Sequence, residues 1–268
     1  MRINTNLNAM IATNQMSKNT ALAGSSMEKL SIGLRITKAG DDAAGLAVSE
    51  KMRAQIRGME QAERNVQDGI SMVQTAEGAL EEAGNIAQRM RELGIQAGKD
   101  TLSAEDRAKV KEELTQLQDE MKKISEETKF NGKKLLNTAG TFTIQAGANS
   151  ETRKIATADL SSIANGLSTI SVSSSTDAQS FITKVDSALK SINDARSDLG
   201  AMQNRLEYTA NNLTTSTENL TAAESRIRDV DVAKEMVTLS KLNILNQASQ
   251  AMVSQAKQQP ESVSQLLR

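Results

Sequence analysis

The chain has 268 residues, with 32 basic and 33 acidic side chains and neither histidine nor cysteine. The absence of histidine and cysteine removes the commonest general base, the commonest metal ligand and all thiol chemistry, so no catalytic group, cofactor or metal site is expected. A net charge of −1 gives no general attraction to nucleic acid or acidic membranes, and no apolar run reaches the ~20 residues that membrane insertion requires.

The first segment, residues 1–34, is predicted to form a weakly charged amphipathic helix. Its apolar side chains follow helical spacing, and asparagine and glutamine are frequent at the other positions. Residues 35–43 break this pattern, and either of the two acidic residues there, Asp41 or Asp42, can cap the next helix through its carboxylate. The apolar contacts expected of this segment are Ile3, Leu7, Met10 and Ile11.

A long helix is predicted next, from about Ala43 to Ala97, with a length of roughly 80 Å at about 1.5 Å per residue. Its apolar residues recur every seven positions, which keeps one stripe on one side of the helix for a partner helix to pack against. Ser103 is predicted to cap a shorter helix that reaches about Thr128. The stripe of the long helix consists of Met52, Met59, Val66, Val73, Leu80 and Ala87.

The following residues, about 130–178, are predicted to contain a small β region. Asn131-Gly132 is a turn signal, and the alternation of polar and apolar residues in Thr141–Ala146 is typical of a half-buried strand. A second strand is expected around Lys154, and the stretch Ser168–Thr176, rich in serine and threonine, is predicted to be a polar loop.

A second stripe with seven-residue spacing predicts that the chain folds back along itself. The fold class is then mainly α, an elongated antiparallel helical bundle or coiled-coil hairpin with a small β-hairpin region, and with the N- and C-terminal helices paired at one end. At the end of this stripe, Arg226 and Arg228 are expected to form local ion pairs with Asp229 and Asp231. The stripe consists of Val185, Ile192, Leu199, Leu206, Leu213, Leu220 and Ile227.

The last segment, residues 234–268, is again weakly charged and apolar along two stripes. A lone pair of terminal helices cannot bury all of its apolar side chains or offset the entropy of ordering them, so both ends are expected to fold against other copies of the chain. Copies joined through different faces build a helical filament when the rotation does not close a ring. The apolar contacts expected of this segment are Val237, Ile244, Leu245, Ala248 and Met252.

Two domains are expected from this order of segments. Residues 1–42 and 230–268 form a terminal assembly domain, and residues 43–229 form a rod that carries the β excursion. A cytoplasmic signalling or adaptor coiled coil is the alternative, since long seven-residue repeats also build such hairpins.

Several runs of sequence carry a more specific signal. They include Met1–Asn6, Glu28–Ala47, Asn219–Asp231 and Gln265–Arg268. These runs resemble bacterial flagellin, the subunit of the flagellar filament, and together with intervening matches they cover about residues 1–145 and 180–268. Because only about 45 residues separate the two halves, the chain resembles a short form that lacks large outer domains.

The resemblance implies a structural subunit that polymerises with itself into the flagellar filament for swimming motility. It also implies export of the unfolded chain by the flagellar type III apparatus, and therefore an extracellular location. Without the resemblance, the absence of a signal sequence suggests a cytoplasmic location. The implied partners are an export chaperone at the C-terminal segment and the filament cap and hook-junction proteins.

The resemblance further implies an innate immune contact. Arg89, Leu93 and Gln96 match a segment with which flagellins contact a vertebrate Toll-like receptor, and Glu113 matches the acidic contact of that surface. The alternative interpretation is that these four residues only pack subunits along the rod.

Overall fold

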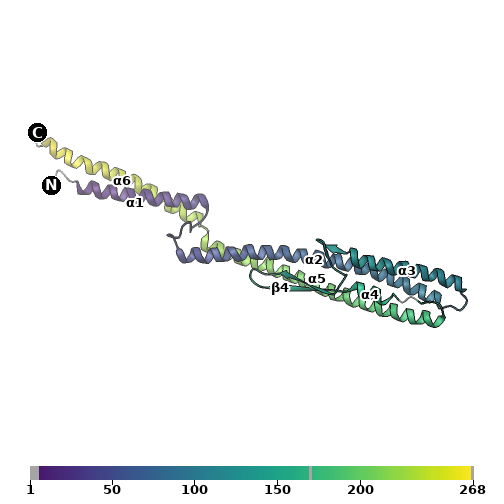
Figure 1. Ribbon diagram of the computed structural model, residues 1–268. Helices are drawn as coiled ribbons and strands as arrows, with labels where there is room; N and C mark the ends of the chain where they lie inside the picture. The colour runs from purple at the N-terminus through teal and green to yellow at the C-terminus, as the bar shows by residue number, and fades with distance from the viewer. Residues whose placement is uncertain (1–5, 169–170, 267–268) are drawn as a thin grey trace. The chain divides into compact units, whose positions relative to one another are not determined.

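The computed structural model describes residues 6–168 and 171–266, with side chains described as far as residue 258 (Figure 1). The chain forms two compact units: a terminal unit, Met1–Ala54 with Asn219–Arg268, and a central unit, Gln55–Glu218. The described elements are α1 (Leu7–Ile32), α2 (Ala43–Ala97), α3 (Ala104–Glu127), β1 (Lys129–Phe130), β2 (Lys133–Lys134), β3 (Gly140–Gln145), β4 (Thr152–Thr157), α4 (Leu160–Gly166), α5 (Ser175–Arg228) and α6 (Val232–Leu266). The predicted mainly α class with a small β-hairpin region is confirmed.

In the central unit, α2 and α5 run antiparallel and side by side (Figure 1). Arg91 Nε donates to Asp186 Oδ1 over 2.7 Å, and Thr214 Oγ1 donates to Glu63 Oε1 over 3.2 Å. Between these two contacts, α2 and α5 each span four seven-residue repeats, so the two stripes keep one register along the whole interface.

The stripe residues within the central unit form the core between α2 and α5. Each of them is at most 8% exposed, whereas the stripe residues that belong to the terminal unit, Met52, Leu220 and Ile227, are only half-buried. Burial of the long stripe is therefore confined to the central unit. The buried members are Met59, Val66, Val73, Leu80 and Ala87 on α2, and Val185, Ile192, Leu199, Leu206 and Leu213 on α5.

Helix α3 begins where the sequence predicts. The Ser103 side chain accepts from the backbone N–H of Asp106, and the Asp106 carboxylate accepts from the backbone N–H of Ser103, which completes a capping box. Leu114 and Met121 of α3 are fully buried.

The predicted β region consists of two separate hairpins. β1 and β2 pair across Asn131 and Gly132, which have φ angles of 47° and 76°, as a tight hairpin turn with two left-handed residues requires. β3 and β4 pair antiparallel from Gly140–Thr157 to Gln145–Thr152, which confirms both predicted strands.

The predicted loop Ser168–Thr176 is wrong at its C-terminal end, because α5 already begins at Ser175. Ser174 Oγ accepts from the backbone N–H of Asp177 and caps this helix. A short helix, α4, precedes the loop and was not expected from the sequence; Asp159 caps it by accepting from Ser162 N over 2.8 Å. Residues 169 and 170 of the predicted loop lie outside the described residues.

In the terminal unit, α1 and α6 pack against each other along much of their length (Figure 1). Asn6 Nδ2 donates to the carbonyl oxygen of Ala256 over 2.6 Å, and Leu34 and Asp229 form an isolated antiparallel bridge. The start of α1 thus lies beside the C-terminal part of α6, and the end of α1 lies beside the start of α6, so the two helices are antiparallel. The predicted pairing of the terminal helices is confirmed.

Candidate assembly interface

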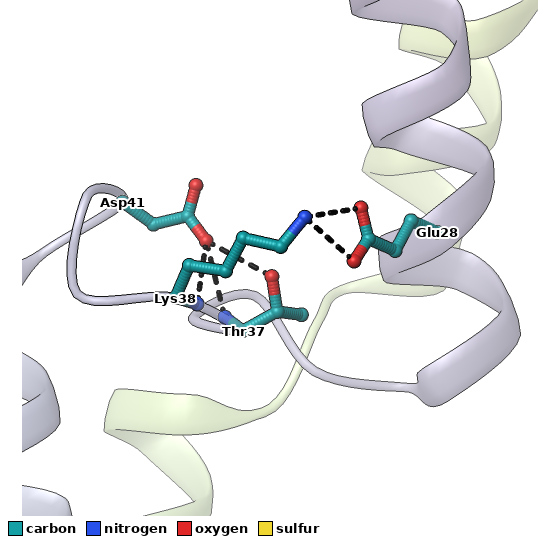
Figure 2. Close-up of polar contacts among 4 residues, drawn as sticks. All are labelled: Glu28, Thr37, Lys38 and Asp41. Atoms are coloured by element: carbon teal, nitrogen blue, oxygen red, sulfur yellow. Dashed lines mark hydrogen bonds and ion pairs between the residues drawn. The ribbon is translucent and has the colours of Figure 1, made fainter.

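The loop between α1 and α2 is organised by one carboxylate. Asp41 Oδ2 accepts from Thr37 N, Thr37 Oγ1 and Lys38 N, each over 3.1 Å, and Lys38 Nζ lies 3.0 Å from the Glu28 carboxylate of α1 (Figure 2). The hydrogen bonds from the backbone N–H of Lys38, then from the backbone and hydroxyl of Thr37, lower the pKa of Asp41. Of the two acidic residues considered as caps, Asp42 caps α2 by accepting from Gly45 N, and Asp41 holds the turn before it.

A second set of contacts fastens this loop to the junction of α5 and α6. Arg35 N donates to the carbonyl oxygen of Arg228 over 2.7 Å, and Arg35 Nη2 donates to that of Ile227 over 2.6 Å. Val230 N donates to the carbonyl oxygen of Gly33 over 3.0 Å. The segment that follows α1 is thus tied to the segment that precedes α6 through hydrogen bonds to main-chain carbonyls.

The local ion pairs expected among Arg226, Arg228, Asp229 and Asp231 are wrong. Arg228 pairs instead with Glu50 of α2, far away in the sequence. Asp229 accepts from Ser225 Oγ, and Asp231 accepts from the backbone N–H of Lys234 at the start of α6. The two aspartates are therefore occupied by hydrogen bonds at the ends of α5 and α6.

The residues that α1 buries against α6 are small or polar. The buried residues of α1 are Asn19, Ala23 and Ser26, and Leu242 is the one large apolar residue of α6 that is buried among the described side chains. Small residues let the two helices approach closely but bury little apolar area.

Most of the large apolar side chains of the same two helices are exposed instead. Twelve of the fifteen large apolar residues that are exposed in the described part of the chain belong to α1 or α6. Exposed contiguous apolar surface on a soluble chain marks an interaction site. The twelve are Leu7, Met10, Ile11, Leu22, Met27, Ile32, Val232, Met236, Val237, Ile244, Leu245 and Met252.

Most contacts predicted for the terminal helices belong to this exposed set, and Ala248 is exposed as well. Ile3 lies outside the described residues. Five members of the exposed set were not predicted, because the pattern was not used to locate the sides on which α1 and α6 meet: Leu22, Met27, Ile32, Val232 and Met236. The spacing of four and three residues through Asn19, Ala23 and Ser26 could have located that side of α1.

A groove of about 620 Å³ runs along the α1–α6 pair. Its apolar lining includes Ile11, Leu245 and Met252, and its polar lining includes Gln15 and the buried Asn19. Apolar side chains beside amides are suited to receive another helix of the same composition.

The four residues predicted to contact an immune receptor lie in the central unit, and two of them pair directly. Arg89 Nη2 lies 2.9 Å from Glu113 Oε1, and the hydrogen bonds that Arg89 donates to Glu113 and then to Glu92 raise the pKa of Arg89. Gln96 is exposed. Leu93 is only 2% exposed, because α2 buries a wider face than its seven-residue stripe, so its side chain is not available to a partner in this conformation.

Among residues 6–168 and 171–266, no cluster of three or more carboxylates could hold a metal ion. Within the same part of the chain, no helix combines the length and the apolar character needed to cross a membrane.

Comparison with known proteins matches both halves of the chain. The family model described as the bacterial flagellin N-terminal helical region matches residues 3–141, and the one described as the bacterial flagellin C-terminal helical region matches residues 182–267. The flagellin of Halalkalibacterium halodurans is 54% identical over 272 residues, and that of Bacillus subtilis is 48% identical over 307 residues; both alignments cover 100% of each chain. The crystal structure of Bacillus cereus flagellin is similar with a TM-score of 0.52 and 35% identity, covering 60% of this chain and 94% of that one.

Proposed function

This chain belongs to the bacterial flagellin family, and on that premise we propose that it polymerises through the apolar faces that α1 and α6 turn to solvent. As a flagellin it is a structural subunit of the extracellular flagellar filament, and it is not an enzyme. Family membership does not favour the alternative of a cytoplasmic signalling or adaptor coiled coil.

One observation carries the assignment of the interface: most large apolar residues of the terminal helices are exposed, while the residues of α1 that the helix pair buries are small or polar. A pair built only for its own stability would bury its largest apolar side chains, since each contributes about 1.5–3 kcal/mol when removed from water. Here Ile11, Val237 and Ile244 are 62%, 70% and 65% exposed. The burial that these side chains lack within one chain is then supplied by neighbouring copies.

We assign assembly to residues 1–42 and 230–268 and the rod to residues 43–229. Support comes from the distribution of exposed apolar residues, since twelve of the fifteen large apolar residues exposed in the described part of the chain lie in these terminal stretches. Within the central unit, Gln55–Glu218, the rod keeps its apolar stripe buried, as a segment that maintains the shape of one subunit requires.

The test is a single charge on the exposed face, Ile244→Lys, in the full chain. Because the side chain is exposed, the helical circular dichroism and melting temperature of the unpolymerised chain are expected to stay near those of the parent. Seeded polymerisation, measured by sedimentation, is expected to be lost because a neighbouring copy would bury an unpaired charge. Ile95→Lys, at an exposed position of α2, is the matched control; equal polymerisation by both variants would refute the proposed interface.

The same terminal helices are the proposed contact for the assembly partners. An export chaperone bound to the C-terminal segment would cover Val237, Ile244 and Met252 before export, which prevents premature polymerisation. The filament cap and the hook-junction proteins would meet the same faces at the two ends of a growing polymer. Support is limited to the exposed apolar character of α6. An equimolar chaperone that fails to inhibit seeded polymerisation would contradict this proposal.

The contact with a vertebrate Toll-like receptor is proposed for Arg89, Gln96 and Glu113, with Leu93 supporting them from beneath. The paired Arg89 and Glu113 are both about half exposed, so their ion pair adds little stability and leaves both groups available to a partner. Arg89→Ala is expected to reduce signalling in a receptor-reporter cell assay while polymerisation is unchanged. Undiminished signalling would contradict the proposal.

A further inference from the structure

The described methionines with the highest and the lowest exposure fall in different units, while Met16, Met52 and Met202 are of intermediate exposure. Four described methionines are exposed, all on the terminal helices, with 49–67% of their surface accessible. Four others are at most 8% exposed, and all of these belong to the central unit. The exposed methionines are Met10 and Met27 of α1 and Met236 and Met252 of α6; the buried ones are Met59, Met72, Met90 and Met121.

The thioether of an exposed methionine is open to oxidation, and a buried one is shielded. We propose that Met10, Met27, Met236 and Met252 form a redox-sensitive switch on assembly, in which oxidation by a peroxide blocks polymerisation and polymerisation in turn protects them. This inference rests on the proposed role of the terminal helices in assembly, and it adds a modification site to that role.

The chemical step needs no group beyond the thioether and the peroxide. Hydrogen peroxide transfers one oxygen atom to the methionine sulfur, so a sulfur–oxygen bond forms, the peroxide O–O bond breaks and water leaves. Sulfur is oxidised by two electrons, and the peroxide is reduced by the same two. The product, methionine sulfoxide, replaces a flexible apolar side chain by a polar one and is reversed by methionine sulfoxide reductases.

The location of these four side chains makes assembly, and not folding, the sensitive step. They contribute little to the packing of one chain because about half or more of their surface is already in water. Met252 lines the α1–α6 groove together with Ile11 and Leu245. A sulfoxide there stays hydrated in the free chain, but a neighbouring copy that covers it would have to remove this hydration, which opposes association.

The experiment uses the full unpolymerised chain and limiting hydrogen peroxide. Peptide mass spectrometry gives the sulfoxide fraction at each methionine, and sedimentation after seeding gives the polymerised fraction. A variant with all four exposed methionines changed to leucine keeps apolar surface and helix propensity but resists mild peroxide. The matched control is the double variant Met59→Leu and Met72→Leu, which leaves the exposed set intact.

The exposed set is expected to oxidise several-fold faster than the buried set in the free chain, and this difference is expected to shrink in preformed polymer. Treated parent and treated double variant are expected to lose most seeded polymerisation, sulfoxide reductases are expected to restore it, and the four-leucine variant is expected to be unaffected. Normal polymerisation of treated parent, or equal inhibition of the four-leucine variant, would overturn the switch while leaving the proposed function intact. Failure of the untreated parent to polymerise on seeds would overturn the proposed function, and the switch with it.

Discussion

The side-chain amide of Asn6 joins the start of α1 to the carbonyl oxygen of Ala256 in α6. Its nitrogen donates to that carbonyl over 2.6 Å, while its oxygen accepts from Ala9 N over 3.0 Å as the helix N-cap. One side chain therefore both begins α1 and fixes its position along α6, and the residues that α1 itself buries are small or polar.

Asn6→Ala is expected to loosen the terminal unit at this end. The lost cap alone destabilises the first turn of α1 by about 1 kcal/mol, and the Ala256 carbonyl loses its side-chain donor. Hydrogen exchange of the unpolymerised chain is expected to accelerate in the first turns of α1 and around Ala256. Asn14→Ala, at an exposed position within α1, is the control; equal acceleration by both variants would contradict the role of Asn6.

Leu206→Glu is expected to destabilise the central unit strongly, because Leu206 is fully buried in the α2–α5 stripe. The loss of apolar burial together with an unpaired buried carboxylate is expected to cost about 3 kcal/mol or more in the free energy of unfolding. Urea denaturation followed by circular dichroism measures this cost. Tyr208→Glu, at a 75% exposed position of the same helix, is expected to leave stability nearly unchanged. Similar losses of stability in both variants would show that Leu206 is not part of the buried α2–α5 stripe.

Features set by local spacing were predictable from the sequence. The seven-residue stripes specify which side of α2 faces α5, and Ser103 with Asp106 encodes a helix start within four residues. The tight turn at Asn131-Gly132 likewise needs only the tolerance of these residues for positive φ.

Features set by distant partners were not predictable. Helix α4 is too short to show a period, and it is held by tertiary contacts such as the one from Gln118 Nε2 to the carbonyl oxygen of Ala164. The pairing of Arg228 with Glu50 and the burial of Leu93 depend on which helices meet, and spacing within one helix does not contain that information. At the candidate interface, most predicted contacts are exposed, but which side of α6 meets α1 depends on the pairing of the two helices.

Two glycines of α2 are expected to respond oppositely to alanine. At Gly78 an added Cβ meets nothing within 4 Å, so Gly78→Ala is expected to stabilise the helix by about 0.5–1 kcal/mol. At Gly58 an added Cβ would lie 2.9 Å from Ala148 Cβ and 3.1 Å from Ala148 Cα, in the turn between β3 and β4. Gly58→Ala is therefore expected to displace that hairpin and to lower the melting temperature. A rise in melting temperature for both variants would show that the β3–β4 turn can move away from the added Cβ at Ala148 without loss of stability.

Asp41→Asn is expected to remove a pH-dependent contribution to the stability of the terminal unit. The pKa of Asp41 is lowered in the folded chain by hydrogen bonds from Lys38 N and from Thr37, so its carboxylate stabilises the fold at pH values above its unfolded pKa. That contribution is lost as the pH falls through the lower, folded pKa. The difference in stability between parent and Asp41→Asn, measured by denaturation at a series of pH values, is thus expected to favour the parent near neutrality and to vanish in strong acid. Asp68→Asn, on α2 in the central unit, controls for the general effect of removing a carboxylate. A parent–variant difference that stays constant down to strong acid would mean that the Asp41 carboxylate is not what holds the turn.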